Sequence, residues 1–364
     1  MSEENYRKLQ EHLDQMPIGF PPAKSGSDIR LLKQLFTPEE AKIAQYLRFG
    51  WDKDLEPIEK IYERAKESGV SLKQLEEKLD IMAKKGSITS KREGEKKFYG
   101  NAALIVGMYE FQVNKLTKEF LETLEEYIVE IWGKQANPTD YHQLRIIPID
   151  IGIKPEHNIA PYDNIKKTIE ESKGPFVKIN CICRQEMDLH GDPCKMTKHK
   201  ENCLGLGALA QNYIDQGWGT QITKEETLQI LNQNQEEGLI FRPNNAQNID
   251  FICSCCYCCD EGIANLLKVP DPANYVDSNY YSQIDSELCT GCSICLDRCQ
   301  LKAITLVDDT ASIDRKRCIG CGNCVVVCPS DAITLQKKEK EYVPPPTMED
   351  LFHLIQEAKI KLKK

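Results

Sequence analysis

Several features are missing from this sequence, and each absence narrows the class of protein. None of its 17 cysteines occurs before Cys181, so the first half of the chain offers no thiol ligands. No uninterrupted apolar run approaches the roughly 18–20 residues that a membrane-spanning helix needs. The polar start MSEENYRKLQEHLD does not read as a signal peptide. Together these absences predict a cytoplasmic protein whose thiols are reduced and available as metal ligands.

The sequence also lacks a basic surplus and the common catalytic signatures. Its net charge is −9 at pH 7, which gives no support for a chain-wide nucleic-acid partner. We find no nucleotide-binding loop, no GxGxxG after a strand and no nucleophile triad. We therefore assign no substrate class and no catalytic residues.

The N-terminal part is rich in helix signals. Prolines and glycines predict a loose arm over residues 1–30, whereas Thr37-Pro38-Glu39-Glu40 is a strong helix start. Helical patterns follow at 56–67 and 71–85, and then a hairpin over 87–100. By the order of these elements, residues 37–112 resemble a winged helix-turn-helix domain.

The strongest motif is a duplicated set of eight cysteines. Four in a first repeat are followed 29 residues later by four in a second: Cys289, Cys292, Cys295 and Cys299, then Cys318, Cys321, Cys324 and Cys328. The flanks CTGCSICLDRCQLKAITL and CIGCGNCVVVCPSDAITL repeat with the same shift. Over residues 284–337 this duplication resembles the bacterial-type ferredoxins that hold two [4Fe–4S] clusters. The repeats differ at Gln300, which stands where the second repeat has Pro329.

The ferredoxin resemblance implies a ligand set in which the fourth cysteine of each repeat serves the other cluster. Cluster 1 then takes Cys289, Cys292, Cys295 and Cys328. Cluster 2 takes Cys318, Cys321, Cys324 and Cys299. Three glycines suit backbone bends that bring amide N–H groups near the sulfurs: Gly291, Gly320 and Gly322.

Nine further cysteines match no ferredoxin spacing and fall into two sets along the chain: Cys181, Cys183, Cys194 and Cys203, then Cys253, Cys255, Cys256, Cys258 and Cys259. A C-x-C pair along a strand places both thiols on one face, which suits two ligands of one site. Arg184, directly after such a pair, can neutralise a thiolate-rich centre.

Three interpretations of these nine cysteines stay open. The first is a third [4Fe–4S] cluster whose ligands come from the earlier set (Cys181, Cys183, Cys194 and Cys203), with the later set as further ligands of a second site. The second is a zinc site, because tetrahedral sulfur ligation suits zinc equally well. The third is redox-active thiols or a less common cluster.

The expected fold class is α+β and multidomain. Its segments are an N-terminal arm (1–36), a winged-helix-like domain (37–112), a cysteine-rich mixed α/β domain (113–269), a dicluster ferredoxin fold (284–337) and a spacer with a tail helix (338–364). In the cysteine-rich domain we expect a strand at 141–153, a helix at 161–174, a strand at 175–183, helices at 204–216 and 224–237, and strands at 239–243 and 248–253. Residues 270–283 read as a linker, and the tail helix is expected to dock on its own protein.

Domain order also bears on function. The chain resembles multidomain ferredoxin-type proteins of anaerobes, in which a winged-helix segment and a CxCR region precede a dicluster domain. This resemblance implies electron transfer without naming a substrate. The leading hypothesis is an electron carrier or a subunit serving an oxidoreductase partner rather than a stand-alone enzyme. The alternatives are an iron–sulfur-sensing transcription regulator that uses the winged helix, and an enzyme that acts in the region of Cys181–Cys259.

Charge weighs against the regulator. Residues 1–100 carry 19 lysines and arginines against 18 acidic residues. The helix at 71–85, which would enter a DNA groove, exposes Glu76, Glu77 and Asp80. Only the hairpin is basic, and we therefore expect protein docking rather than sequence-specific DNA binding.

Overall fold

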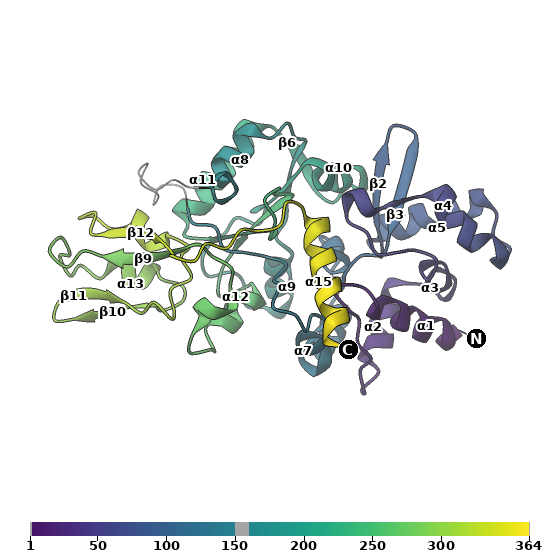
Figure 1. Ribbon diagram of the computed structural model, residues 1–364, viewed down its shortest axis with the longest axis horizontal. Helices are drawn as coiled ribbons and strands as arrows, with labels where there is room; N and C mark the ends of the chain where they lie inside the picture. The colour runs from purple at the N-terminus through teal and green to yellow at the C-terminus, as the bar shows by residue number, and fades with distance from the viewer. Residues whose placement is uncertain (1, 150–159, 364) are drawn as a thin grey trace. The chain divides into compact units, whose positions relative to one another are not determined.

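A computed structural model describes residues 2–149 and 160–363 of the chain (Figure 1). The chain forms two units. Unit 1 comprises Met1–Tyr141, Gln211–Trp218 and Thr347–Lys364, and unit 2 comprises His142–Ala210 and Gly219–Pro346. All 17 cysteines lie in unit 2. No helix among the described residues has the length and apolar character needed to cross a membrane.

Unit 1 begins with two helices, α1 (Ser2–Asp14) and α2 (Ser27–Leu35). The expectation of a loose arm over residues 1–30 is therefore wrong for this part of the chain. Tyr6, Leu9 and Leu13 recur at helical spacing and are buried, so burial of one apolar face stabilises α1. The prolines that suggested a loose arm fall between the two helices.

The next elements follow the expected order. They are α3 (Pro38–Ala44), β1 (Glu56–Pro57), α4 (Ile58–Ala65), α5 (Leu72–Lys85), β2 (Thr89–Glu93) and β3 (Lys96–Gly100). Thr37 and Glu40 form the capping box that starts α3, which confirms the predicted helix start. The strands form an antiparallel sheet in the order β1-β3-β2. The three helices and the hairpin are thus present, and their assignment to the winged-helix class stays a prediction.

The remainder of unit 1 supports a C-terminal helix. Its further elements are η3 (Leu104–Met108), η4 (Glu110–Gln112), α6 (Lys118–Tyr127), η5 (Ile128–Trp132), α7 (Gly133–Gln135), the second half of α10 (Gly207–Gln216) and α15 (Met348–Leu362). Met348, Leu351, Phe352 and Ile355 of α15 pack in one apolar cluster with Ile18 and other residues of unit 1. The tail helix therefore docks on its own protein, as predicted.

Unit 2 contains a five-stranded antiparallel sheet in the order β6-β4-β5-β8-β7. The strands are β4 (Phe176–Ile179), β5 (Cys203–Leu206), β6 (Thr220–Ile222), β7 (Ile240–Pro243) and β8 (Phe251–Cys255). The helices α8 (Ile165–Glu171) and α11 (Lys224–Glu236) pack against the sheet through Ile169 and Leu231. A strand was predicted over 141–153; residues 144 and 147 form only isolated bridges, and 150–153 lie outside the described residues.

Two predicted boundaries in unit 2 are wrong, and both errors concern cysteines. The strand β4 ends at Ile179, and the helix α9 (Ile182–His190) follows, so Cys181 caps a helix instead of ending a strand. Residues 203–206 form strand β5 rather than the start of a helix. A strand forms here because β5 pairs with a strand on each side and the side chains of Leu204 and Leu206 are buried.

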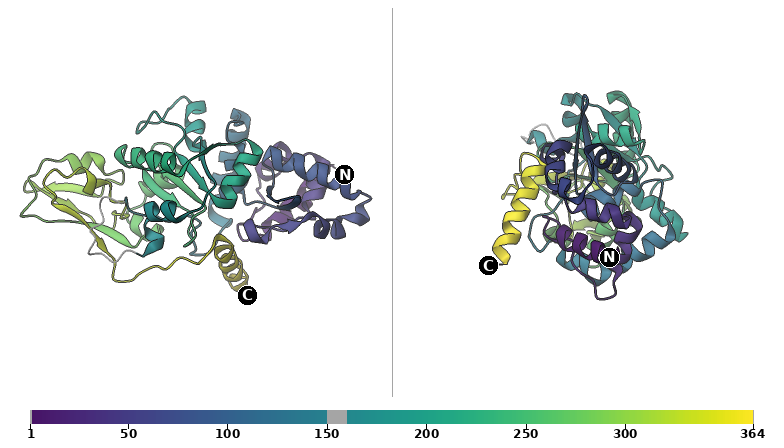
Figure 2. Two further views of the ribbon diagram at one scale, coloured as in Figure 1. Left: turned by 90° about the horizontal axis from the view of Figure 1, so that it is seen from above. Right: turned by 90° about the vertical axis from the view of Figure 1, so that its right-hand side faces the viewer.

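The eight ferredoxin-type cysteines lie in a segment of two small antiparallel sheets (Figure 2). β9 (Tyr280–Ile284) pairs with β12 (Ile333–Lys337), and β10 (Ile304–Val307) pairs with β11 (Thr310–Ile313). The helices α13 (Ile294–Arg298) and α14 (Asn323–Val326) each start within a repeat, and α12 (Glu261–Leu266) precedes the segment. Because β9 begins at Tyr280, the predicted linker at 270–283 is too long. We call residues 280–337 the eight-cysteine segment.

Candidate metal centres

Two cavities in the eight-cysteine segment group its cysteines across the repeats. One is lined by Cys299 of the first repeat together with Cys318, Cys321 and Cys324 of the second. The other is lined by Cys289, Cys292 and Cys295 together with Cys328. The grouping is that of the two quartets which the ferredoxin resemblance implied.

The backbone around these cavities is shaped to leave room beside the sulfurs. Gly291, Gly320 and Gly322 have φ values of 67°, 73° and 79°, which confirms that these positions need backbone bends open to glycine. A Cβ atom at Gly291 would lie 2.3 Å from the carbonyl oxygen of Asp309, and one at Gly320 would lie 2.1 Å from that of Tyr280. Only glycine fits at either place.

Backbone N–H groups point at the sulfurs, as expected for thiolates that carry negative charge. Ala311 donates to Cys289 Sγ at 3.4 Å, Ala303 to Cys299 Sγ at 3.3 Å and Ser282 to Cys318 Sγ at 3.3 Å. Such hydrogen bonds stabilise a thiolate ligand and tune the potential of the metal centre that it binds. These donors and the glycine turns fit two polynuclear thiolate-bound centres.

Burial raises the pKa of two thiols, Cys321 and Cys324, at the cavity that they line with Cys299 and Cys318. The pKa of Cys324 rises to about 12. These thiols are therefore protonated at neutral pH until a metal displaces the protons. Cys292 of the other quartet is exposed, so that quartet lies nearer to solvent.

The structure groups the nine other cysteines differently from the prediction. Cys194 lies with Cys256, Cys258 and Cys259, and all four sulfurs are within 4.8 Å of one another. We call these four the tetrathiolate group. The quartet predicted from Cys181, Cys183, Cys194 and Cys203 does not assemble as one group, because the loop after α9 carries Cys194 towards the turn after β8.

The other five cysteines form a second thiol group, which we call the five-thiol group: Cys181, Cys183, Cys203, Cys253 and Cys255. The thiol of Cys181 interacts with those of Cys183 and Cys203, and Cys253 interacts with Cys203 and Cys255. Among the described residues, these five do not form a set of sulfurs all within 4.8 Å of one another. The group is thus more open than the tetrathiolate group.

A buried arginine lies between the two thiol groups. Arg184 is 2% exposed, and its Nη2 lies 3.7 Å from Cys256 Sγ and 3.0 Å from the carbonyl oxygen of Ser254. Burial alone lowers the pKa of Arg184, but the negative charges of Cys181 and Cys256 outweigh it and raise the pKa. The expectation that Arg184 neutralises a thiolate-rich centre agrees with this position.

Gln300 links the eight-cysteine segment to the tetrathiolate group. It is 8% exposed and follows the ligand candidate Cys299. Its Nε2 donates to the carbonyl oxygen of Gly238 at 2.6 Å, and its Oε1 accepts from the backbone N–H of Tyr257 at 2.8 Å. Tyr257 stands between Cys256 and Cys258. The mismatch between the two repeats at this position was the only sequence signal of the link.

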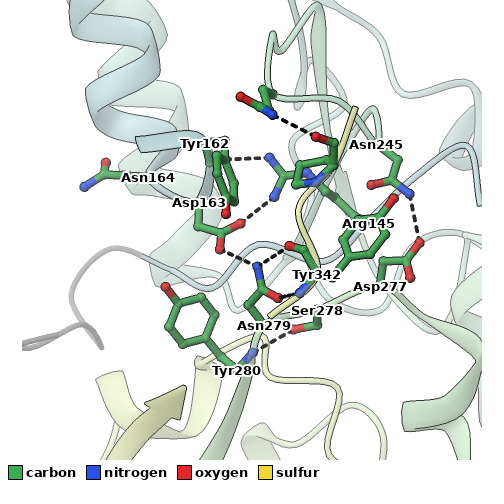
Figure 3. Close-up of polar contacts among 12 residues, drawn as sticks. Arg145, Tyr162, Asp163, Asn164, Asn245, Asp277, Ser278, Asn279, Tyr280 and Tyr342 are labelled. Carbon is green, nitrogen blue, oxygen red and sulfur yellow. Dashed lines mark hydrogen bonds and ion pairs between the residues drawn. The ribbon is translucent and has the colours of Figure 1, made fainter. Parts of the chain in front are cut away.

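A buried polar network, which sequence reasoning missed, holds the eight-cysteine segment at its start and end (Figure 3). Arg145 and Asp163 form an ion pair of 2.6 Å in which both side chains are 2% exposed. Asn279, just before β9, donates to Asp163 at 2.8 Å and accepts from the N–H of Tyr342 at 2.7 Å. Burial raises the pKa of Asp163 and lowers that of Arg145, so each needs the other to stay charged.

Comparison with known proteins supports the metal chemistry of one part of the chain. Residues 311–334 match the family model described as a 4Fe-4S binding domain. No curated protein and no solved structure matches the chain. The chain therefore contains an iron–sulfur segment of ferredoxin type.

Proposed function

We propose that the eight-cysteine segment holds two [4Fe–4S] clusters and transfers electrons, as a carrier or as a subunit serving an oxidoreductase. Each cluster, when bound, supplies a site that accepts and releases one electron. The observation that carries the proposal is the pair of cavities, each lined by three cysteines of one repeat and the fourth cysteine of the other. Cluster 1 is assigned to the quartet with Cys292, and cluster 2 to the quartet with Cys321.

The two quartets differ in solvent exposure, and we assign them different roles in electron transfer. Cys318 and Cys324 are buried and Cys299 and Cys321 are half-buried, so the cluster 2 quartet has no exposed cysteine. In the cluster 1 quartet Cys292 is exposed, and the neighbouring Leu288 and Ile294 are 51% and 46% exposed. Exposed apolar side chains beside a redox site suit the docking of a partner protein. We assign electron exchange with that partner to this surface.

Paired cysteine variants of the full-length protein, purified without oxygen, test the crossed assignment. Cys299→Ser combined with Cys318→Ser removes two ligands of one cluster and should cost about four irons per chain. Cys299→Ser combined with Cys289→Ser removes one ligand from each cluster and should cost about eight. The reverse pattern would mean that each fourth cysteine serves its own repeat. Fewer than eight irons in the unaltered protein would contradict two clusters.

Unit 1 is assigned a docking or scaffold role rather than DNA recognition. Lys97 of the hairpin forms ion pairs of 2.7 Å with Glu76 and 2.6 Å with Asp80, both on α5. Lys91 likewise pairs with Asp52 and Glu93. Basic side chains that are already neutralised by neighbouring acids have less to gain from phosphate contacts. This favours the electron carrier over the transcription regulator.

A further inference from the structure

The tetrathiolate group has the dimensions of a site for one metal ion. Its sulfurs lie 3.6 Å apart for Cys194 and Cys256, 3.9 Å for Cys194 and Cys258, 3.6 Å for Cys256 and Cys258, and 3.8 Å for Cys258 and Cys259. A tetrahedral zinc ion with Zn–S bonds of about 2.3 Å holds its four sulfurs about 3.8 Å apart. The four measured separations therefore match the edges of a single tetrahedron.

The eight-cysteine segment supplies an internal comparison. A cubane of four irons and four sulfides has to fit between its ligands, which keeps the cysteine sulfurs well apart. In line with this, the two quartets there line cavities, and among the described residues neither forms a set of sulfurs within 4.8 Å of one another. The four sulfurs of the tetrathiolate group, by contrast, all lie within 4.8 Å of one another. We propose that it binds one zinc ion and no cluster.

The surroundings of the group suit a closed, charged metal site. Four thiolates around Zn²⁺ leave a net charge of −2, which the buried side chain of Arg184 partly offsets beside Cys256. The backbone N–H of Lys195 donates to Cys258 Sγ at 3.3 Å. Four protein ligands fill the tetrahedron and leave no position for water or substrate, which is the arrangement of structural rather than catalytic zinc.

The place of the ion in the fold defines its role. Cys194 lies in the loop after α9, and the other three ligands lie in the turn between β8 and α12. The zinc ion joins these two loops. It thereby holds Tyr257, whose backbone N–H donates to Gln300 beside the cluster 2 ligand Cys299.

Zinc K-edge X-ray absorption on the full-length, anaerobically purified protein is the deciding measurement. We expect about one zinc per chain, with four sulfur neighbours at about 2.3 Å and no iron neighbour. A metal analysis with iron and without zinc, or a signal from neighbouring iron atoms, would overturn the assignment. This measurement needs no variant, so it decides the proposal even if the variants below fold poorly.

Variants then assign the ligands. Cys258→Ser, at a half-buried position, should lose the zinc and keep the iron of the eight-cysteine segment. The matched control is Cys255→Ser, which removes a neighbouring cysteine of the five-thiol group and should keep the zinc. Zinc retained in Cys258→Ser, or lost in both variants alike, would overturn the assignment. Because the readout is zinc, its failure is distinguishable from failure of the iron–sulfur proposal.

Discussion

The two cysteine-rich regions of unit 2 hold similar numbers of thiols, eight and nine, but arrange them differently. In residues 280–337 each quartet surrounds a cavity. In residues 181–259 four sulfurs lie in direct contact and five others form a more open group. Under the two proposals above, the number of cysteines says little about the cofactor, whereas the separation of their sulfurs distinguishes a cluster from a single ion.

The difference should be largest in the response to oxygen. Brief exposure of the native protein to air, followed by gel filtration, should remove most of the iron, because Cys292 is exposed and iron–sulfur clusters are redox-active. The zinc should stay bound, because Zn²⁺ has no redox chemistry. Metal analysis before and after exposure gives the result, and gel filtration without oxygen is the control. Parallel loss of both metals would remove the distinction between the two regions.

The second prediction concerns the buried polar network of Arg145, Asp163 and Asn279 at the start and end of the eight-cysteine segment. Asp163→Asn leaves Arg145 buried without its partner and should lower the free energy of unfolding by about 3–5 kcal/mol. An anaerobic urea titration followed by cluster absorbance measures this change. Glu341→Gln is the matched control: its ion pair with Lys337 is partly exposed and should cost at most about 1 kcal/mol. Equal losses in the two variants would show that the buried ion pair stabilises the protein no more than the partly exposed one.

The third prediction concerns Gln300, whose side chain hydrogen-bonds to the backbone of Tyr257, within the tetrathiolate turn, and to that of Gly238. Gln300→Pro gives the first repeat the residue of the second and leaves the N–H of Tyr257 and the carbonyl of Gly238 without this partner. Loss of buried hydrogen bonds of this kind costs about 1–3 kcal/mol. The same titration measures the loss, and Pro329→Gln is the reciprocal control. A Gln300→Pro protein as stable as the original would mean that the two regions are independent.

Local signals in the sequence predicted the duplicated frame and helices such as α3, α5 and α11, but missed α1 and α9. The capping box at Thr37 and the spacing of the eight cysteines both act over a few residues, so spacing alone specifies them. The cysteines that lie near Cys194 depend on the contact between the loop after α9 and the turn after β8. No local sequence pattern specifies a contact between two such distant segments. The same holds for Arg145 and Asp163, which are 18 residues apart and paired only by the fold.

The smallest effect is expected in unit 1, which contains no cysteines. If electrons pass only through unit 2, removal of the clusters should leave duplex DNA binding unchanged and weak. Glu76 and Asp80 on α5 would meet phosphate repulsion, and Lys97 is already paired with both. A selection from random duplexes at near-physiological salt, with intact and cluster-free protein, measures this. One enriched sequence that is bound tightly and released on cluster loss would favour the transcription regulator instead, because it would couple unit 1 to the redox state of unit 2.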